Sequence, residues 1–362
     1  SYSGKKVLIT GHTGFKGTWL TTWLHSLGAE VYGVSCDIPT SPSMFEALRL
    51  EEEIHHYQID VRDYDALYEV VKEIRPDFIF HLAAQAIVSK SYANPTETIT
   101  TNVIGTMNIL EALRQINLPC VAVIITSDKC YDNVEWVYGY KETDGLGGKD
   151  IYSGSKGAAE LVFKSYYHSF FKGEHSNVRL VSARAGNVIG GGDWALDRIV
   201  PDCMRSWSDK KVVEIRSPFA TRPWQHVLEP LSGYLNVGAV LSEDSSLSGQ
   251  SFNFGPKAEV SKTVKELLED LSLCWKYNSP SEAYVITDNM KFHEAGLLKL
   301  NCDKALFYLK WHSALDYEQL LHFTGDWYYN YYKKSIDMLE YTQQQINEYT
   351  QIAQNKGIKW TK

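Results

Sequence analysis

The amino-acid sequence predicts an α/β fold, in which a doubly wound parallel sheet is joined to a smaller α/β lobe. Two observations lead to this prediction. In the first half of the chain, short runs rich in β-branched residues alternate with segments of helical periodicity. This alternation is typical of right-handed crossovers in a parallel sheet that is covered on both faces. From about residue 187 the alternation stops, and loops rich in Gly and Pro separate longer, more polar helices.

The first half contains six predicted strands and four predicted helices. The strand runs are short and apolar, whereas the helical segments carry apolar residues at intervals of three and four. One helix is expected to end before Pro76, because the residue before a proline disfavours the helical conformation. The predicted strands are residues 6–10, 30–35, 55–60, 77–83, 121–127 and 178–184, and the predicted helices are residues 17–28, 63–74, 101–116 and 153–171.

These segments predict two interleaved lobes. Residues 1–186, joined by residues 223–241, are expected to form the lobe that contains the large sheet. Residues 187–362 are expected to form the smaller lobe. Within it, the segment from about residue 333, "KKSIDMLEYTQQQINEYTQIAQNKG", predicts an exposed helix because polar residues dominate its surface.

Composition argues against several classes of function. The formal charge of −8 disfavours nucleic-acid binding, which needs basic surface, and no apolar run reaches the length of a membrane-spanning helix. The first residues lack the features of a signal peptide, and the six cysteines are scattered without paired spacing, so we expect a reduced, cytoplasmic protein. The eleven histidines form no HExxH motif, so we expect no metal site.

A glycine-rich turn follows the first strand, in the segment "VLITGHTGFKG". Glycines at this place allow a tight turn, close approach of a pyrophosphate, and close packing of helix on strand. The helix that follows presents free N–H groups and a partial positive charge to the pyrophosphate. The turn therefore predicts a dinucleotide site formed by Gly11, His12, Gly14, Phe15, Lys16 and Gly17.

Two acidic residues after later strands extend this site. Asp37, after the second strand, is placed to bind an adenosine ribose and would repel a 2′-phosphate, so NAD is the expected cofactor. The positive charge of Lys16 near the turn would suit either the 2′-phosphate of NADP or the pyrophosphate itself. Asp60, followed by Val61, ends the third strand and can accept a hydrogen bond from adenine, or else cap the next helix.

A tyrosine and a lysine in "YSGSK" predict the reaction centre. Tyr152 and Lys156 are four residues apart, hence on one face of a helix. The lysine is expected to lower the pKa of the phenol and to hold the nicotinamide ribose. Tyr152 can then take a hydroxyl proton while hydride leaves the same carbon. Ser127 lies upstream at the end of the fifth strand.

The chain resembles the extended short-chain dehydrogenase/reductases over nearly its whole length. The resemblance is found in "TGHTGFKG", "HLAAQ", "TNVIGT", the serine before YxxxK, and "RPWQHV". It implies an NAD(P)-binding Rossmann lobe and a smaller lobe that binds a nucleotide-sugar. It also implies that Ala83, Ala84, Gln85 and Asn102 line the cofactor, although the alanines are equally explained by close packing at a strand end.

The segment "TSDKCYDN" favours one branch of this family. Its 4,6-dehydratases carry an acid–base pair after the serine, usually Asp–Glu, whereas its epimerases do not. Here Asp128 and Lys129 take those places. Oxidation at C4 of the sugar makes the C5 proton acidic, so one group removes that proton and the other protonates the departing C6 oxygen. We expect Asp128 to be the acid and Lys129 to be the base. If Lys129 remains an ammonium, it can only donate a proton or orient the substrate. The non-catalytic alternative is that the two side chains form an exposed ion pair.

Substrate contacts are predicted mainly from the resemblance. "DIPT", "AAQAIVSKSY" and "ARAGNVIGGGDW" are most similar to members that act on CDP-D-glucose. Arginine suits phosphate because its planar fork donates two hydrogen bonds. Arg222 of "RPWQHV" is the strongest candidate and Arg198 a weaker one, whereas Arg205 and Arg216 are interpreted as surface charges. Ser91 and Asn187 match substrate-contacting positions, and Trp194 and Trp224 are interpreted as core residues rather than base-stacking ones.

Two other functions remain open from the sequence. A nucleotide-sugar 4-epimerase shares every motif except the acid–base pair. A redox sensor that binds NAD(P) without turnover is less favoured, because such proteins typically lose the tyrosine or lysine. The family commonly dimerises through two helices of each subunit, and residues 96–117 and 151–172 are the candidates here. We therefore expect a homodimer or a larger homo-oligomer.

Overall fold

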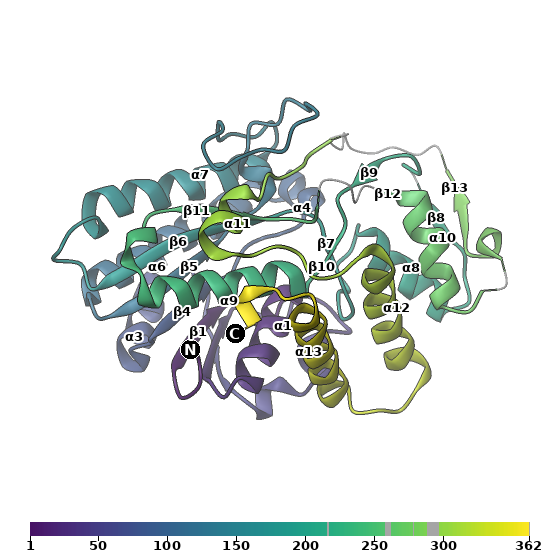
Figure 1. Ribbon diagram of the computed structural model, residues 1–362, viewed down its shortest axis with the longest axis horizontal. Helices are drawn as coiled ribbons and strands as arrows, with labels where there is room; N and C mark the ends of the chain where they lie inside the picture. The colour runs from purple at the N-terminus through teal and green to yellow at the C-terminus, as the bar shows by residue number, and fades with distance from the viewer. Residues whose placement is uncertain (216, 258–261, 278, 288–296, 362) are drawn as a thin grey trace.

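A seven-stranded parallel sheet forms the centre of the computed structural model (Figure 1). The structure describes residues 1–362 except 216, 258–261, 278, 288–296 and 362. The strand order β11-β6-β5-β4-β1-β2-β3 runs outward in both directions from β1 and β4. This order confirms the predicted doubly wound sheet. The strands are β1 (Lys6–Thr10), β2 (Glu30–Ser35), β3 (His55–Gln58), β4 (Phe78–His81), β5 (Cys120–Ile125), β6 (Val178–Ala185) and β11 (Ser251–Phe254).

All six predicted strands form, but three of them end earlier than predicted. Residues 59–60, 82–83 and 126–127 leave the sheet and enter the loops at its carboxyl edge. The seventh strand, β11, was not predicted, because four residues of "SFNF" give too short a periodic signal. It pairs with β6 and so brings part of the second half of the chain into the large sheet.

The sheet separates two apolar cores. Along β1, Val7 and Ile9 join one core and Leu8 joins the other, as the alternation of side chains along a strand requires. The helices α1 (Phe15–Ser26) and α9 (Leu228–Glu243) pack in the first core, and Figure 1 shows α9 running across that face. The other core is covered by α3 (Tyr64–Ile74), α6 (Gly105–Ile116) and α7 (Ile151–Tyr166).

Two of the predicted helices include wider, π-helical turns. The residues Thr100–Ile104 form one between α5 (Pro95–Ile99) and α6, and Tyr167–Phe171 form another after α7. Such turns insert an extra residue into a helix and are frequent at functional sites. The short helices α2 (Met44–Ala47) and α4 (Val88–Ala93) complete the first half.

The second half of the chain adds smaller elements beside the carboxyl edge of the sheet (Figure 1). Its division from the first half at about residue 187 stays a prediction. The two-residue strands pair as β7 (Val188–Ile189) with β10 (Gln225–His226) and β9 (Thr221–Arg222) with β12 (Lys262–Thr263), and β8 (Val213–Ile215) pairs with β13 (Tyr284–Ile286). The remaining helices are α8 (Ile199–Ser208), α10 (Val264–Cys274), α11 (Asp303–Leu309), α12 (Tyr317–Lys333) and α13 (Met338–Asn355).

The helix predicted near the end of the chain forms as α13, but the prediction that it is exposed is wrong for one of its faces. One face of α13 is buried, and Tyr349 at its centre has no exposed surface. The Tyr349 hydroxyl donates a hydrogen bond to Glu229 of α9 (2.8 Å), and its ring meets that of Trp23 of α1 edge-on. The helix therefore packs on the sheet lobe, and even Gln345 is buried on that face, where it donates to the Phe323 carbonyl (2.9 Å).

Within the described part of the chain, no helix has both the length and the apolar character needed to cross a membrane.

Candidate active site

Two glycines shape the turn after β1. Gly11 has a φ of +77°, and a Cβ there would lie 2.8 Å from the Ala83 backbone nitrogen. Gly17, in the first turn of α1, is more crowded, since its Cβ would lie 2.1 Å from the Gly11 carbonyl oxygen. Gly14 is the N-cap residue of α1 and supplies no side-chain cap. The first N–H groups of α1 therefore have no side-chain partner at the N-cap, which fits the pyrophosphate of a dinucleotide.

Two larger side chains of the turn pack inward. The His12 ring is buried and bonds to the His56 ring (2.7 Å) and the Ser35 hydroxyl (3.0 Å). Burial, helped by His56, lowers the pKa of His12 to about 4, so this imidazole is neutral at pH 7. The Phe15 ring lies close to Gly190. Cofactor contacts of His12 and Phe15 would therefore be made by their backbone atoms, and they stay predictions.

Asp37 follows β2 and is exposed. Its carbonyl accepts a hydrogen bond from the Thr13 hydroxyl (2.7 Å), which fixes the end of β2 to the glycine-rich turn. An exposed carboxylate beside this turn fits the ribose contact predicted for Asp37, which stays a prediction.

Asp60 does not cap a helix. The side chain that caps α3 is Asp63, which accepts a hydrogen bond from the Ala66 backbone (3.1 Å). Asp60 instead pairs with Arg62, whose side chain lowers the pKa of the carboxyl group. Val61 is buried beside it. Helix capping by Asp60 is thus excluded, and adenine contacts by Asp60 and Val61 stay predictions.

Asn102 organises the segment after β4. Its side chain accepts a hydrogen bond from the Gln85 backbone N–H (2.8 Å) and donates to the Gln85 carbonyl (3.1 Å) and the Ser155 hydroxyl (2.8 Å). Ser155 belongs to α7, so Asn102 connects residues 83–85 with the helix of the reaction centre. Ala83 lies against Gly11, as close packing requires, and a direct cofactor contact of Ala84 or Gln85 is not tested.

Ser127, Asp128 and Lys129 follow β5 and begin a single 3₁₀ turn, Asp128–Cys130. The Ser127 hydroxyl donates to Asp128 (2.9 Å) and accepts from the Lys129 N–H (3.2 Å). Asp128 is only 5% exposed, and burial raises its pKa, although Lys129 and Ser127 oppose that rise. The prediction of an exposed Asp128–Lys129 ion pair is therefore wrong for the carboxylate.

Tyr152 and Lys156 are both buried on α7. Burial raises the pKa of Tyr152 to about 12, against the opposing effects of its hydrogen bond to Ser127 and of Arg198. The Lys156 ammonium lies 6.0 Å from the phenol ring centroid. The prediction that Lys156 leaves the phenol with a lowered pKa is wrong, because the loss of water around the hydroxyl outweighs a charge at that distance.

Two cations from distant segments reach this centre. Lys16 of the glycine-rich turn has a pKa lowered to about 8 by burial and by Arg198, whereas Asp128 raises it. The Arg198 guanidinium is held by Asp193 (2.8 Å) and acts electrostatically on Tyr152. Lys16 therefore lies among the charged groups of the reaction centre, which the sequence did not predict.

The other predicted substrate residues are spread over three segments. Gly186 precedes Asn187, and a Cβ on it would lie 2.9 Å from a carboxylate oxygen of Asp128, so Asn187 adjoins the reaction centre. Ser91 is buried in α4 and donates to the Val88 carbonyl (2.7 Å). Arg222 lies on β9, where it donates to the Thr221 carbonyl (2.9 Å).

The remaining aromatic and basic candidates have structural partners. Arg205 was predicted to be a surface charge, but it is partly buried and donates to the Trp194 carbonyl (2.6 Å). Trp194 and Trp224 are 3% and 6% exposed, which confirms that they are core residues. Arg216 lies outside the described residues.

Three acidic residues support this site but were not predicted. Asp150 caps α7 by accepting from the Ser153 N–H (3.0 Å), a pattern that its position before the helix could have revealed. Asp193 orients Arg198, and Glu160 lies beneath the reaction centre. Glu160 pairs with Arg184 of another element, so no local pattern identifies it, whereas Asp193 lies only five residues from Arg198.

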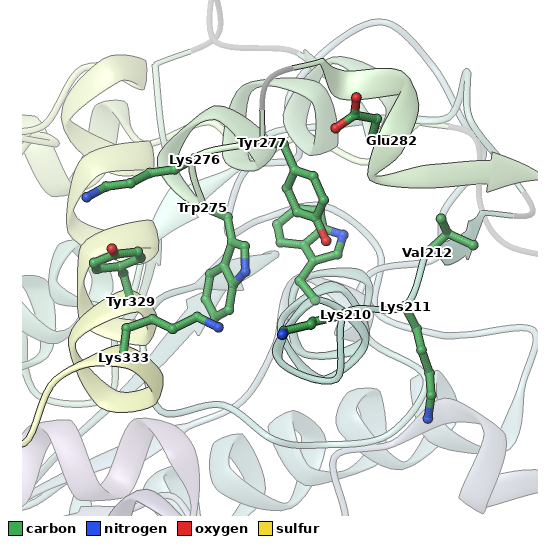
Figure 2. A pocket seen from close by; sticks show the side chains of 10 residues that line it. Lys210, Lys211, Val212, Trp275, Lys276, Tyr277, Glu282, Tyr329 and Lys333 are labelled. Atoms are coloured by element: carbon green, nitrogen blue, oxygen red, sulfur yellow. The ribbon is translucent and has the colours of Figure 1, made fainter.

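A cavity of about 340 Å³ lies away from this site (Figure 2). It is at the C-terminal end of α8, whose ten residues span about 15 Å, whereas Arg198 is at the N-terminal end. The lysines around it lie at the C-terminal ends of α8, α10 and α12, where cations stabilise the helix dipoles. Lys210 and Lys211 follow α8, Lys276 follows α10, and Lys333 ends α12. Its lining residues include Trp207, Lys210, Lys211, Trp275, Lys276, Tyr277, Glu282, Tyr329 and Lys333.

The architecture and the site define the class of protein. The family model for GDP-mannose 4,6-dehydratase matches residues 8–324. The chain belongs to this family of extended short-chain dehydrogenase/reductases. Among its relatives is the CDP-glucose 4,6-dehydratase of Salmonella typhimurium, which is 44% identical over 351 residues, covering 96% of this chain and 97% of the relative.

Solved structures share the fold at lower identity. The UDP-glucose 4-epimerase of Thermotoga maritima superposes with a TM-score of 0.76 at 21% identity, covering 90% of this chain and 99% of the epimerase. The dTDP-glucose 4,6-dehydratase of Bacillus anthracis, in complex with NAD, gives a TM-score of 0.73 at 20% identity, covering 90% and 96% of the two chains. These similarities confirm the fold.

We predict that Gly17→Ala weakens dinucleotide binding at least about tenfold, roughly 1.4 kcal/mol, because the new methyl group displaces the Gly11 carbonyl and the turn with it. Isothermal titration with NAD measures this. Gly173→Ala is the control, since a Cβ at Gly173 meets nothing within 4 Å. Equal affinities of the two variants would contradict the role given to the turn.

Proposed function

We propose that this chain is an NAD-dependent hydro-lyase that converts CDP-D-glucose to CDP-4-keto-6-deoxy-D-glucose. The observation that carries this proposal is the buried Asp128 beside Lys129, next to Ser127 and Tyr152. The identity of 44% to a CDP-glucose 4,6-dehydratase, over nearly the full length of both chains, supports it. Epimerisation needs no such acid–base pair, which disfavours the 4-epimerase alternative.

NAD fits the glycine-rich turn, the uncapped start of α1 and the carboxylate of Asp37. The NAD in the solved structure of a dTDP-glucose 4,6-dehydratase supports this choice. When bound, NAD accepts hydride from C4 of the sugar and returns it to C6. The residues of this chain hold the reactants and move the protons.

Tyr152 takes the proton of the C4 hydroxyl during oxidation. A phenol with a pKa near 12 is protonated at neutral pH, so it needs positive charge to become a base. Arg198 lowers this pKa, and so does the hydrogen bond between the phenol and Ser127. Lys156 adjoins the phenol on the same helix and is placed to hold the nicotinamide ribose.

Asp128 and Lys129 then remove water from C5 and C6. Burial raises the pKa of Asp128, which favours the protonated acid that the leaving C6 oxygen requires. Asp128 gives its proton to that oxygen, and Lys129, which must be the neutral amine for this step, takes the C5 proton and becomes an ammonium. A water molecule leaves and a C5–C6 double bond forms. Addition of hydride at C6 and of a proton at C5 completes the 6-deoxy sugar.

The substrate is proposed to bind between the cofactor lobe, residues 1–186 with 223–241, and the lobe of residues 187–362. Asn187 adjoins Asp128, and Arg222 is proposed to bind the nucleotide phosphates. Ser91 is proposed to contact the sugar, although its hydroxyl must then leave the Val88 carbonyl. A cytoplasmic location is supported by the six cysteines, all of which are free.

Incubation of the purified protein and NAD with CDP-, GDP-, dTDP- and UDP-glucose tests the function. We expect the alkaline absorbance of a 4-keto-6-deoxy sugar to appear at least about tenfold faster with CDP-glucose than with the others, a discrimination of about 1.4 kcal/mol. Formation of an epimer, or no conversion of any of the four, would overturn the proposal.

We predict that Lys129→Met slows formation of the 6-deoxy product at least about a hundredfold, because general acid–base groups contribute that much. Substrate should still reduce the nicotinamide, so its reduced form should accumulate and be visible by absorbance. The exposed Lys141 provides the control variant, Lys141→Met. A normal rate of product formation by Lys129→Met would show that Lys129 is not the base.

We propose a homodimer formed by the helices of residues 95–116 and 151–171. Ile104, Leu161 and Phe170 on these helices are exposed, which an interface would cover. Leu161→Glu is expected to give monomers in light scattering after size exclusion. Leu273 is as exposed as Leu161, at 55%, but lies on α10, so Leu273→Glu should leave the oligomer intact. A monomeric wild-type protein would refute the interface.

A further inference from the structure

A buried ion pair adjoins the reaction centre. Glu160 is one helical turn after Lys156 on α7, and Arg184 is on β6. Neither side chain has exposed surface, and two hydrogen bonds join them, from Nε to Oε1 (2.9 Å) and from Nη2 to Oε2 (2.7 Å). This is the bidentate geometry in which arginine binds a carboxylate most strongly.

The pair contacts the residues on both sides of the segment 127–129. The Thr126 hydroxyl, just before this segment, donates to Glu160 (2.5 Å). On the other side, Arg184 donates to the Tyr131 hydroxyl (2.8 Å) and lies 4.9 Å from the centroid of its ring. The Tyr131 hydroxyl donates in turn to Asn253 of β11 (2.7 Å).

We propose that the Glu160–Arg184 ion pair positions the segment 127–129 against the helix that carries Tyr152 and Lys156. Stability alone is a weak explanation of the pair, because well-packed apolar side chains often stabilise a core as much as a buried ion pair does. Apolar side chains, however, cannot form hydrogen bonds of fixed length to Thr126 and Tyr131. The pair thus sets the distance between the acid–base groups and the phenol.

Glu160 has a second effect, on the charge of Lys156. The ionisable groups that act on Lys156, or on which it acts, come from several elements. Burial lowers the pKa of Lys156 to about 8, and Cys130 and Glu160 oppose this fall. Burial raises the pKa of the Cys130 thiol, so Glu160 supplies the negative charge at neutral pH. The other ionisable groups around Lys156 are Lys16 of α1, Tyr152 of α7 and His81 of β4. His81 is neutral at pH 7.

The sign of the pH effect follows from this charge. Without the carboxylate, the pKa of Lys156 falls further below 8, so the ammonium loses its proton at lower pH. If activity requires the ammonium, its decline on the alkaline side then begins at a lower pH than in the wild type. With an effective dielectric constant near 20, a charge about one helical turn away shifts a pKa by roughly 2 units.

Glu160→Gln tests the proposal, and its activity readout rests on the proposed function. We expect kcat to fall by roughly 10- to 100-fold, as small misplacements of reacting groups do, with KM nearly unchanged. The alkaline limb of the kcat profile should move roughly 2 pH units lower. Glu229→Gln is the matched control. Its carboxylate is equally buried but binds the Ala314 and Leu315 backbone, so its alkaline limb should not move.

Two further variants separate position from charge. Arg184→Lys keeps both charges but loses the two-pronged contact, so kcat should fall while the alkaline limb stays in place. If Glu160→Gln does not fold because it leaves Arg184 buried without a partner, Glu160→Gln/Arg184→Gln removes both charges, and kcat should still fall. A folded Glu160→Gln variant with wild-type kcat and an unmoved alkaline limb would overturn the proposal.

Hydrogen exchange tests the positioning without any substrate. Amides of residues 126–131 should exchange at least about tenfold faster in Glu160→Gln than in the wild type, because their anchor is weakened. They should be unchanged in Glu229→Gln. If the wild type does not convert CDP-glucose, the proposed function fails, whereas this exchange result still decides the role of the ion pair. Unchanged exchange in Glu160→Gln would refute that role.

Discussion

Exclusion of water from ionisable groups is the constraint on which the reaction centre depends. Asp128, Tyr152 and Lys156 are all buried, and in each case burial shifts the pKa toward the neutral form. Asp128 and Tyr152 therefore hold their protons more tightly, and Lys156 releases its proton more easily, until charge is added to the site. The cationic nicotinamide and the anionic nucleotide-sugar proposed to bind here carry charges of that kind, so their binding would change the proton affinities of the side chains. The chemistry is thereby coupled to binding.

The parallel sheet explains why residues so far apart in the chain meet. The carboxyl ends of parallel strands lie along one edge, and ligands bind there where the strand order reverses. The turn after β1, Asp37 after β2, residues 83–85 after β4, the segment 127–129 after β5 and Asn187 after β6 all follow strand ends. β1 and β4 are neighbours at the point of reversal, and Gly11 touches Ala83 there.

This regularity is also why much of the fold and site could be predicted. Strand periodicity and the Gly11–Gly17 spacing are local signals, so they are visible in the sequence. Contacts between distant segments are not. Nothing local shows that α13 packs on α1, that four residues at 251–254 extend the sheet, or that Asp63 rather than Asp60 caps α3. The pKa of Tyr152 was predicted in the wrong direction because spacing reveals a neighbouring lysine but not the loss of solvent.

The π-helical turn at Thr100–Ile104 limits where this chain can change in length. Asn102 lies within that widened turn and bonds to both residue 85 and Ser155. Each residue of an α-helix advances its direction by about 100°. A one-residue deletion just ahead of Asn102 would relax the backbone into ordinary helix yet swing the amide away from both partners. Insertions and deletions are thus tolerated less here than in the surface loops, although the strand-to-helix crossover itself would accept them.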